Sequence, residues 1–189
     1  DMPFAWRASL VAACLVQIVL LGKSVWLFRD QINPDGVSYI RIAQYAVRGQ
    51  IDLMISGVWS PLLSWLIVPW LVVFDDPLHA AHAAMAVSAI VFLCGCWCVL
   101  RAVRLPGTAL LLGLWITAVC SVAWSTAVIS PDLLMAGLFC GGTSRLCSHQ
   151  WVTNTRTALG VGMVLGAAYL AKAVALPVSA LVIMAFAGT

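Results

Sequence analysis

The sequence predicts an all-α fold, a polytopic bundle of transmembrane helices with further helices lying on the membrane surface. Hydrophobic residues make up 63% of the 189 residues, charged residues make up 9%, and the mean hydropathy is +1.03. A soluble domain carries roughly 25% charged residues, so this chain cannot cover a surface that faces water. Its long apolar runs, separated by polar breaks, indicate that a lipid bilayer is its solvent. The net charge of +3 gives no indication of a nucleic-acid partner.

Six apolar runs are predicted to be spans of a single transmembrane domain that covers residues 1–189. The first is long enough to cross roughly 30 Å of hydrocarbon and lacks a signal-peptide cleavage site, so we expect it to be a retained anchor. The chain starts without Met and stops directly after an apolar run, and we therefore expect it to be the N-terminal part of a longer protein. The predicted spans are 8–28, 78–100, 105–128, 133–146, 157–176 and 177–187 onward.

The polar stretch 29–77 after the first run is predicted to hold two helices that do not cross the membrane. Asn33-Pro34-Asp35 is typical of a turn that starts a helix, and an amphipathic helix follows over about 35–48, with Gly49 as its stop. The stretch 60–74 is apolar, but it is shorter than the about 20 residues that a straight span needs. It contains two prolines and several tryptophans, which favour the membrane interface. We therefore expect both helices to lie on the membrane surface.

The distribution of arginines supports this topology. Basic residues prefer the cytoplasmic side of a membrane. If the stretch 60–74 does not cross, then Arg7, the pair Arg101 and Arg104, and the pair Arg145 and Arg156 all fall on one side. The acidic loop 30–76 and the break at 130–132 then face the extracytoplasmic side.

Two aspartates on that predicted outer side are candidates for catalysis. Asp35 begins the amphipathic helix, where a carboxylate either caps free backbone N–H groups or acts as a base or metal ligand. Asp132 lies in the break Ser130-Pro131-Asp132 between two spans, where it is either a turn residue or a second acid. Because both loops open on the same face, the two carboxylates could together bind a divalent cation or activate a hydroxyl acceptor.

Two basic residues are candidates for binding a phosphate group. Lys172 lies inside an apolar stretch, where it is either a lysine that reaches the interface or a positive charge for a lipid-linked phosphate. Arg41 is the second candidate, and its alternative is the solvated face of a helix. Both interpretations stay open for each residue.

The histidines and cysteines are predicted to be structural. His79 and His82 share one helix face, as a metal pair or as ordinary interfacial residues. The seven cysteines lie mostly inside apolar runs, and the alternation of Cys94, Cys96 and Cys98 fans these three side chains around a helix. We expect small apolar fillers rather than a metal or redox cluster, and therefore no disulfide and no metal site.

Four sequence stretches, in this order, resemble the GT-C glycosyltransferases, and in particular the bacterial protein-mannosyltransferase-like and RgtA/B/C/D-like members. The stretch 33–40 after the first span, with the helix that ends at Gly49, looks like their first outer loop. The stretch 59–66 looks like their proline-containing surface helix, and 131–134 looks like the acidic break after the third span. The last, 166–172, is similar to their Gly-Leu-Ala-x-Leu-Thr-Lys stretch.

The resemblance implies an inverting transfer of a sugar from a polyprenyl-phosphate donor to a glycan, lipid or protein acceptor outside the cytoplasm. In a bacterial inner membrane the site would face the cell envelope. Asp35 and Asp132 would be the catalytic carboxylates, and Lys172 or Arg41 would bind the donor phosphate. The resemblance also makes Tyr39, Trp59 and Ser60 candidates for the substrate cleft.

Two departures from the family pattern are visible. Gly36 stands where many members have a second acid, so a divalent cation is not required by this sequence, and the region 79–82 lacks the family's arginine. The alternative function is a multi-pass transporter or flippase without glycosyl transfer. Such a protein would need charged or broken helices around a cavity at the membrane midplane.

Overall fold

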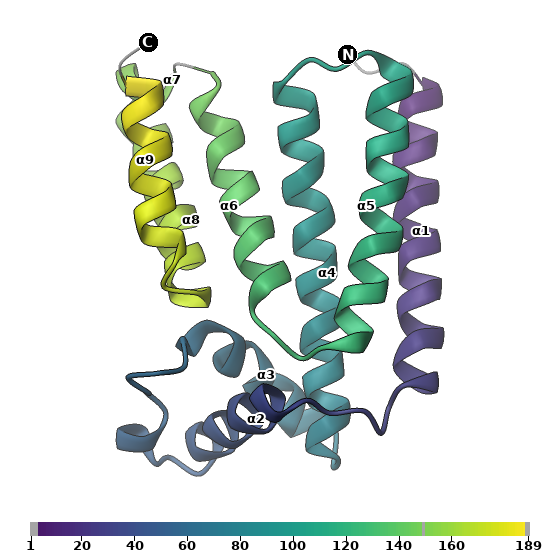
Figure 1. The fold of residues 1–189 in the computed structure, drawn as a ribbon, viewed down its shortest axis with the longest axis vertical. Coiled ribbons are helices and arrows are strands. Elements are labelled where there is room, and N and C mark those ends of the chain that lie inside the picture. The colour runs from purple at the N-terminus through teal and green to yellow at the C-terminus, as the bar shows by residue number, and fades with distance from the viewer. Residues whose placement is uncertain (1–3, 149, 188–189) are drawn as a thin grey trace.

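The computed structural model describes residues 4–148 and 150–187, and the part of the chain that it describes is helical without any strand (Figure 1). This confirms the all-α prediction. The elements are α1 (Phe4–Leu27), α2 (Pro34–Val47), the 3-10 helix η1 (Ile51–Leu53), α3 (Pro61–Val73), α4 (Pro77–Ala102), α5 (Gly107–Ala127), α6 (Asp132–Leu146), α7 (Gln150–Thr153), α8 (Thr155–Ala171) and α9 (Ala175–Ala187).

Three of these helices are long and apolar enough to cross a membrane, namely α1, α4 and α5. The helices α6, α8 and α9 have 15, 17 and 13 residues. In Figure 1, α6 runs beside α4, whereas α8 and α9 lie on the other side of α6, and all three end above the layer formed by α2 and α3. This layer therefore occupies the space below the ends of the shorter helices.

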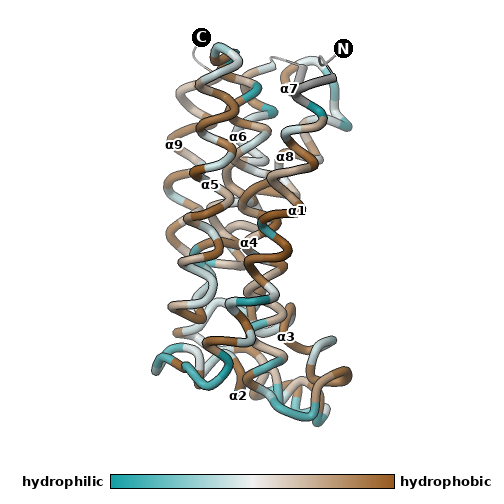
Figure 2. Tube along the Cα trace, turned by 90° about the vertical axis from the view of Figure 1, so that its right-hand side faces the viewer, coloured by the Kyte–Doolittle hydropathy of each residue, from teal (hydrophilic) through white to brown (hydrophobic). Residues whose placement is uncertain are grey.

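The bundle has two chemically different ends. We call the end that holds the α4–α5 and α6–α8 connections the basic end, because Arg101, Arg104, Arg145 and Arg156 lie there. The opposite end, which holds α2, α3 and the α5–α6 connection, is called the loop end. The middle of the bundle is hydrophobic and the polar residues gather at its two ends (Figure 2). All six aspartates of the described chain lie at the loop end: Asp30, Asp35, Asp52, Asp75, Asp76 and Asp132.

The loop end is built on α2 and α3 packed against the start of α4. Pro34 occupies the first turn of α2, where its missing N–H has no intrahelical partner to lose. The helix ends before Gly49, whose φ of 70° is the left-handed conformation that favours glycine, as the sequence predicted. Tyr39, Leu63 and Ile67 are buried here against the alanines of α4, and they form the largest apolar core of the protein.

α3 is a short helix of 13 residues, about 20 Å long. It packs on α2 and α4 and also touches α8, and is shorter than the roughly 30 Å hydrocarbon core of a bilayer.

Two glycines allow α4 and α6 to approach closely. A Cβ atom on Gly95 would lie 2.0 Å from the Gly137 carbonyl oxygen, and a Cβ on Gly137 would lie 2.6 Å from the Cα of Phe92. Real Cβ atoms do not approach the backbone so closely, so only glycine fits at either position. Small residues of this kind are the usual means by which apolar helices pack in lipid.

Gln17 joins three helices in the middle of the bundle. Its side chain is buried, and its Nε2 donates hydrogen bonds to the Ala89 carbonyl oxygen (3.1 Å) and to the Ser121 hydroxyl (2.8 Å). A buried amide needs such partners. This polar link between α1, α4 and α5 has no counterpart in the sequence predictions.

The predicted span 157–176 is wrong at its C-terminal end. The helix α8 ends at Ala171, Lys172 adopts an extended conformation, and α9 begins at Ala175. Pro177 accounts for the break, because proline is tolerated in the first turn of a helix but not in its interior. Lys172 therefore lies in a break between two helices rather than inside a span.

A candidate charged site at the loop end

An ion pair joins two helices that are distant in sequence. Lys172, directly after α8, donates through Nζ to the Oδ1 atom of Asp132, the first residue of α6. The side chains are 44% and 34% exposed, so the pair is open to solvent or to a ligand on one side. Lys172 thus has an anionic partner at the start of α6. The two residues were predicted as separate parts of the site, and the structure brings them into contact.

The start of α2 is attached to the break that precedes Asp132. Asn33 Oδ1 accepts a hydrogen bond from the backbone N–H of Ile129 (2.9 Å), and Asn33 Nδ2 donates to the Ile129 carbonyl oxygen (3.3 Å). Because Asn33 precedes α2 and Ile129 lies three residues before Asp132, this pair of bonds brings the loop after α1 to the α5–α6 connection. This contact was not predicted from the sequence. An asparagine before a helix-starting proline is usually taken for a cap.

Gly36 permits this close attachment. A Cβ atom at this position would lie 3.0 Å from Asn33 Oδ1 and 3.0 Å from Ile129 Cβ, which is tighter than ordinary packing. A carboxylate side chain would need still more space. The absence of a second acid next to Asp35 therefore has a steric reason in this chain.

Asp35 lies in the first turn of α2 and is exposed. The cap interpretation of Asp35 is wrong in one respect, because Asn33 occupies the N-cap position and α2 starts at Pro34. The carboxylate makes no hydrogen bond or ion pair with any residue that the structure describes. Its negative charge still interacts favourably with the N-terminal end of the helix dipole. Asp35 is thus an available carboxylate, unlike Asp132.

Tyr39 lies within the electrostatic reach of both aspartates. It is one turn after Asp35 on the same side of α2, and only 4% of its surface is exposed. Burial, together with the charges of Asp35 and Asp132, raises the pKa of Tyr39 to about 12. The phenol is therefore protonated at neutral pH. Both aspartates lie at the same end of the bundle as Tyr39.

Trp59 and Ser60 complete this side of the loop end. The Trp59 ring meets the Tyr39 ring edge-on, with centroids 5.3 Å apart and an interplanar angle of 72°. Ser60 is half-buried at the N-cap position of α3, without a capping hydrogen bond from its side chain. Trp59 thus covers the buried Tyr39 ring.

Arg41 lies on a different face of α2 from Asp35 and Tyr39, since residues two apart on a helix do not face each other. Its Nε donates a hydrogen bond to the Tyr45 hydroxyl (2.8 Å). With Trp59 and Asp52 it lines a pocket of about 310 Å³. Arg41 thus lies near Trp59 in this pocket, which Lys172 does not line.

The two histidines do not act as a pair. His79 lies beside Asp76, with Nδ1 3.5 Å from the carboxylate, whereas His82 is buried. Across the described residues, no three His, Cys or Asp side chains are placed to hold a metal ion together.

Comparison of the chain with protein-family models, with curated proteins and with solved structures finds no match. The chemical capacity of the loop end is therefore judged from its residues alone. This end of the bundle carries the available carboxylate of Asp35, the Lys172 ammonium group paired with Asp132, and the protonated phenol of Tyr39. Such a set can accept a proton and neutralise an anionic leaving group.

Proposed function

We propose that this chain carries the site of a multi-pass membrane glycosyltransferase, which moves a sugar from a polyprenyl-phosphate donor to an extracytoplasmic acceptor. The observation that carries the proposal is the Lys172–Asp132 ion pair, at the end of the bundle where Asn33 attaches the first outer loop. An ammonium group at this depth suits the phosphate of a lipid-linked donor. Asn33, Asp132 and Lys172 all lie in stretches that resemble the GT-C glycosyltransferases.

The proposed reaction is an inverting displacement at the anomeric carbon of the donor sugar. The acceptor hydroxyl oxygen forms the new bond to this carbon, and the bond from the carbon to the phosphate oxygen breaks. The acceptor proton passes to Asp35, whose carboxylate has no competing partner among the described residues. Lys172 neutralises the leaving phosphate. Positioning and charge neutralisation supply most of the catalysis, because polyprenyl phosphate is already a good leaving group.

Asp132 is a positioning residue in this proposal. Its carboxylate is occupied by Lys172 and so is less suited to accept a proton than Asp35. It holds the ammonium group toward the donor. Trp59, which packs on the buried Tyr39 ring, would contact the sugar, and Arg41 would act from the pocket that it lines together with Trp59.

The orientation in the membrane follows from the segregation of charge. The described aspartates gather at the loop end and the cluster of four arginines lies at the basic end. Since basic residues prefer the cytoplasm, the loop end would be extracytoplasmic, in a bacterial inner membrane. A transporter would need its ionisable residues near the midplane. The placement of both charged clusters at the ends of the bundle favours the enzyme.

The experiment that tests this function uses membranes that contain the full-length natural protein. These membranes are incubated with a panel of radiolabelled polyprenyl-phosphate sugars, and the release of polyprenyl phosphate and the labelling of acceptors are measured. We expect sugar transfer that depends on the protein and is lost in the Lys172→Met variant. If no donor on the panel reacts, and the protein instead promotes uptake into vesicles or lipid scrambling, the protein is a transporter or flippase.

A further inference from the structure

The basic end of the bundle holds arginines that have no acidic partner among the residues that the structure describes. Arg101, Arg104, Arg145 and Arg156 form no ion pair with any described residue, and all the described aspartates lie at the opposite end. A group of uncompensated guanidinium charges repel one another, and their repulsion is relieved when an anion binds between them. In the function proposed above these arginines only orient the chain in the membrane and take no part in the transfer reaction.

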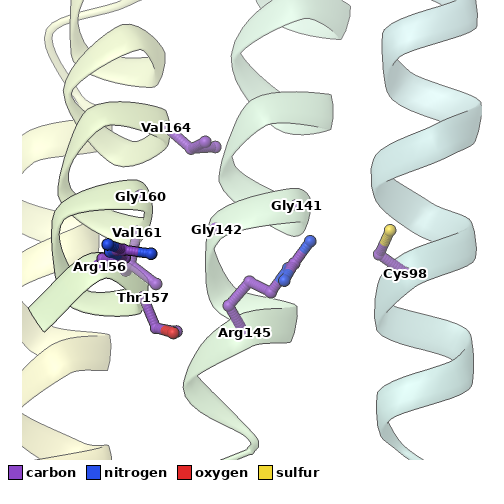
Figure 3. A pocket seen from close by; sticks show the side chains of 9 residues that line it. All are labelled: Cys98, Gly141, Gly142, Arg145, Arg156, Thr157, Gly160, Val161 and Val164. Carbon is purple, nitrogen blue, oxygen red and sulfur yellow. The ribbon is translucent and has the colours of Figure 1, made fainter. Parts of the chain in front are cut away.

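These arginines line two adjoining pockets. One pocket, of about 470 Å³, lies between α4, α6 and α8, and Arg145 and Arg156 line it (Figure 3). The other, of about 450 Å³, is lined by Arg101, Arg104 and Arg145. Arg145 lines both, so the two pockets adjoin at this residue.

The first pocket owes its width to glycine. Figure 3 shows Arg145 extending from α6 toward α4, which carries Cys98, with Gly141 beside it, and Gly160 also lines this pocket from α8. A Cβ atom on Gly141 or on Gly160 would meet no other atom within 4 Å. The space is therefore open rather than filled by side chains. The first turn of α8, with Arg156 and Thr157, adds the positive end of a helix dipole.

The backbone of Arg104 is strained. Its φ of 55° lies in the left-handed region that a non-glycine residue enters at a cost, at the position after α4 where glycine is usual. Strained residues of this kind concentrate at functional sites. An arginine at this position is consistent with a role for its charge.

We propose that the pockets between α4, α6 and α8 at the basic end bind a phosphate group. Guanidinium groups match the geometry of phosphate oxygens through paired hydrogen bonds, and basic pockets between transmembrane helices bind phosphorylated lipid headgroups. The apolar residues deeper in the first pocket, Val161 and Val164, would contact the part of the ligand next to the phosphate. The phosphate belongs either to a membrane lipid or to a soluble phosphate compound. Separate binding measurements with a lipid probe and with inorganic phosphate distinguish the two sources.

The test uses the full-length purified protein and two probes, dioleoylphosphatidylglycerol in mixed micelles and inorganic phosphate in solution. Binding is measured by native mass spectrometry for the lipid and by calorimetry for phosphate. We expect Arg145→Gln and Arg156→Gln each to weaken binding about tenfold, the effect of losing a charge-assisted hydrogen bond. Gly160→Leu, which fills the pocket, should weaken it as well.

Matched controls separate the pocket from the general positive charge of this end. Gly162→Leu places the same side chain on α8, where a Cβ also meets nothing within 4 Å, but outside the pocket. Arg7→Gln removes a charge outside both pockets. Both controls should bind as the unaltered protein does, and all variants should keep its melting temperature.

Each outcome decides the proposal. Binding of the lipid alone identifies a headgroup site, and binding of inorganic phosphate as well identifies a site for soluble phosphates. The proposal is overturned if the unaltered protein binds neither probe, or if Arg145→Gln/Arg156→Gln binds as tightly as it does. It is also overturned if Arg7→Gln and Gly162→Leu lose as much affinity as the pocket variants.

Discussion

Lys172 and Asp132, forty residues apart in the sequence, form an ion pair that joins the end of α8 to the start of α6. Both residues were predicted from the sequence to belong to one site, but with separate tasks. Their contact implies that the position of the positive charge depends on the carboxylate. This dependence can be measured.

We expect Asp132→Asn and Lys172→Met each to lower the free energy of unfolding by about 1 kcal/mol, because the pair is only partly buried. The double variant should lose less than the sum of the two, since the second substitution removes a charge that has already lost its partner. Denaturant unfolding of the four proteins in detergent measures this coupling. Strictly additive losses would show that the pair contributes nothing.

Asp35→Asn should abolish most of the sugar transfer without unfolding the protein. Asparagine preserves the shape of the side chain but cannot accept the acceptor proton, and a general base contributes typically 10²–10⁴-fold in rate. Transfer from the lipid-linked donor is measured beside the melting temperature. Asp75→Asn is the matched control, an exposed aspartate at the same end of the bundle. Near-normal transfer by a folded Asp35→Asn protein would contradict the assignment of Asp35 as the base.

The stability of the loop end should fall at alkaline pH through Tyr39. The pKa of this phenol is raised from 10.0 to about 12. The unfolded chain therefore loses the phenolic proton at lower pH than the folded protein does. Stability present below about pH 10 is lost as the pH rises toward 12, by roughly 2–3 kcal/mol in all.

Thermal melts of the unaltered protein and of Tyr39→Phe across this pH range provide the measurement. Phenylalanine cannot ionise, so the melting temperature of the variant should decline less steeply above pH 10. Parallel curves for the two proteins would show that Tyr39 ionises alike in the folded and unfolded states.

The helix α3 should not cross the membrane. In a background without cysteine, Asp52→Cys and Asp75→Cys lie before and after α3, and both should react with an impermeant thiol reagent from the same side. Asp75 is preferable to Asp76, because Asp76 Oδ1 caps α4 by accepting a hydrogen bond from the Leu78 N–H (2.8 Å). Val103→Cys, at the basic end, should react only from the other side. Labelling of positions 52 and 75 from opposite sides would overturn the topology.

Gly137→Ala should destabilise the protein strongly, whereas Gly141→Ala in the same helix should not. A methyl group at 137 meets the backbone of α4 at 2.6 Å, and at 141 it meets nothing within 4 Å. Overpacking of this kind costs typically 1–3 kcal/mol, and alanine is otherwise the better helix former. Denaturant unfolding of both variants in detergent measures the difference. Equal stability of the two would mean that α4 and α6 move apart without cost.

The sequence by itself determined the all-α class, the three long apolar helices, the two short helices of the loop after the first span and the turn at Gly49. It also placed the four arginines Arg101, Arg104, Arg145 and Arg156 at the end opposite the aspartates. These features depend on local composition and length: how many consecutive residues are apolar, and where proline and glycine interrupt them. They can therefore be read from neighbouring residues alone.

Only the tertiary structure decided which polar groups meet. The bonds from Asn33 to Ile129, the ion pair of Lys172 with Asp132, and the links of Gln17 to α4 and α5 each join residues that are 40 to 104 positions apart. Such contacts depend on how helices pack. Here the packing is set by the close approach of Gly95 and Gly137, and by a break at Lys172 that ended a predicted span early. Helix packing of this kind leaves no periodic signal in the sequence, because one small or polar residue at a crossing point is enough to determine it.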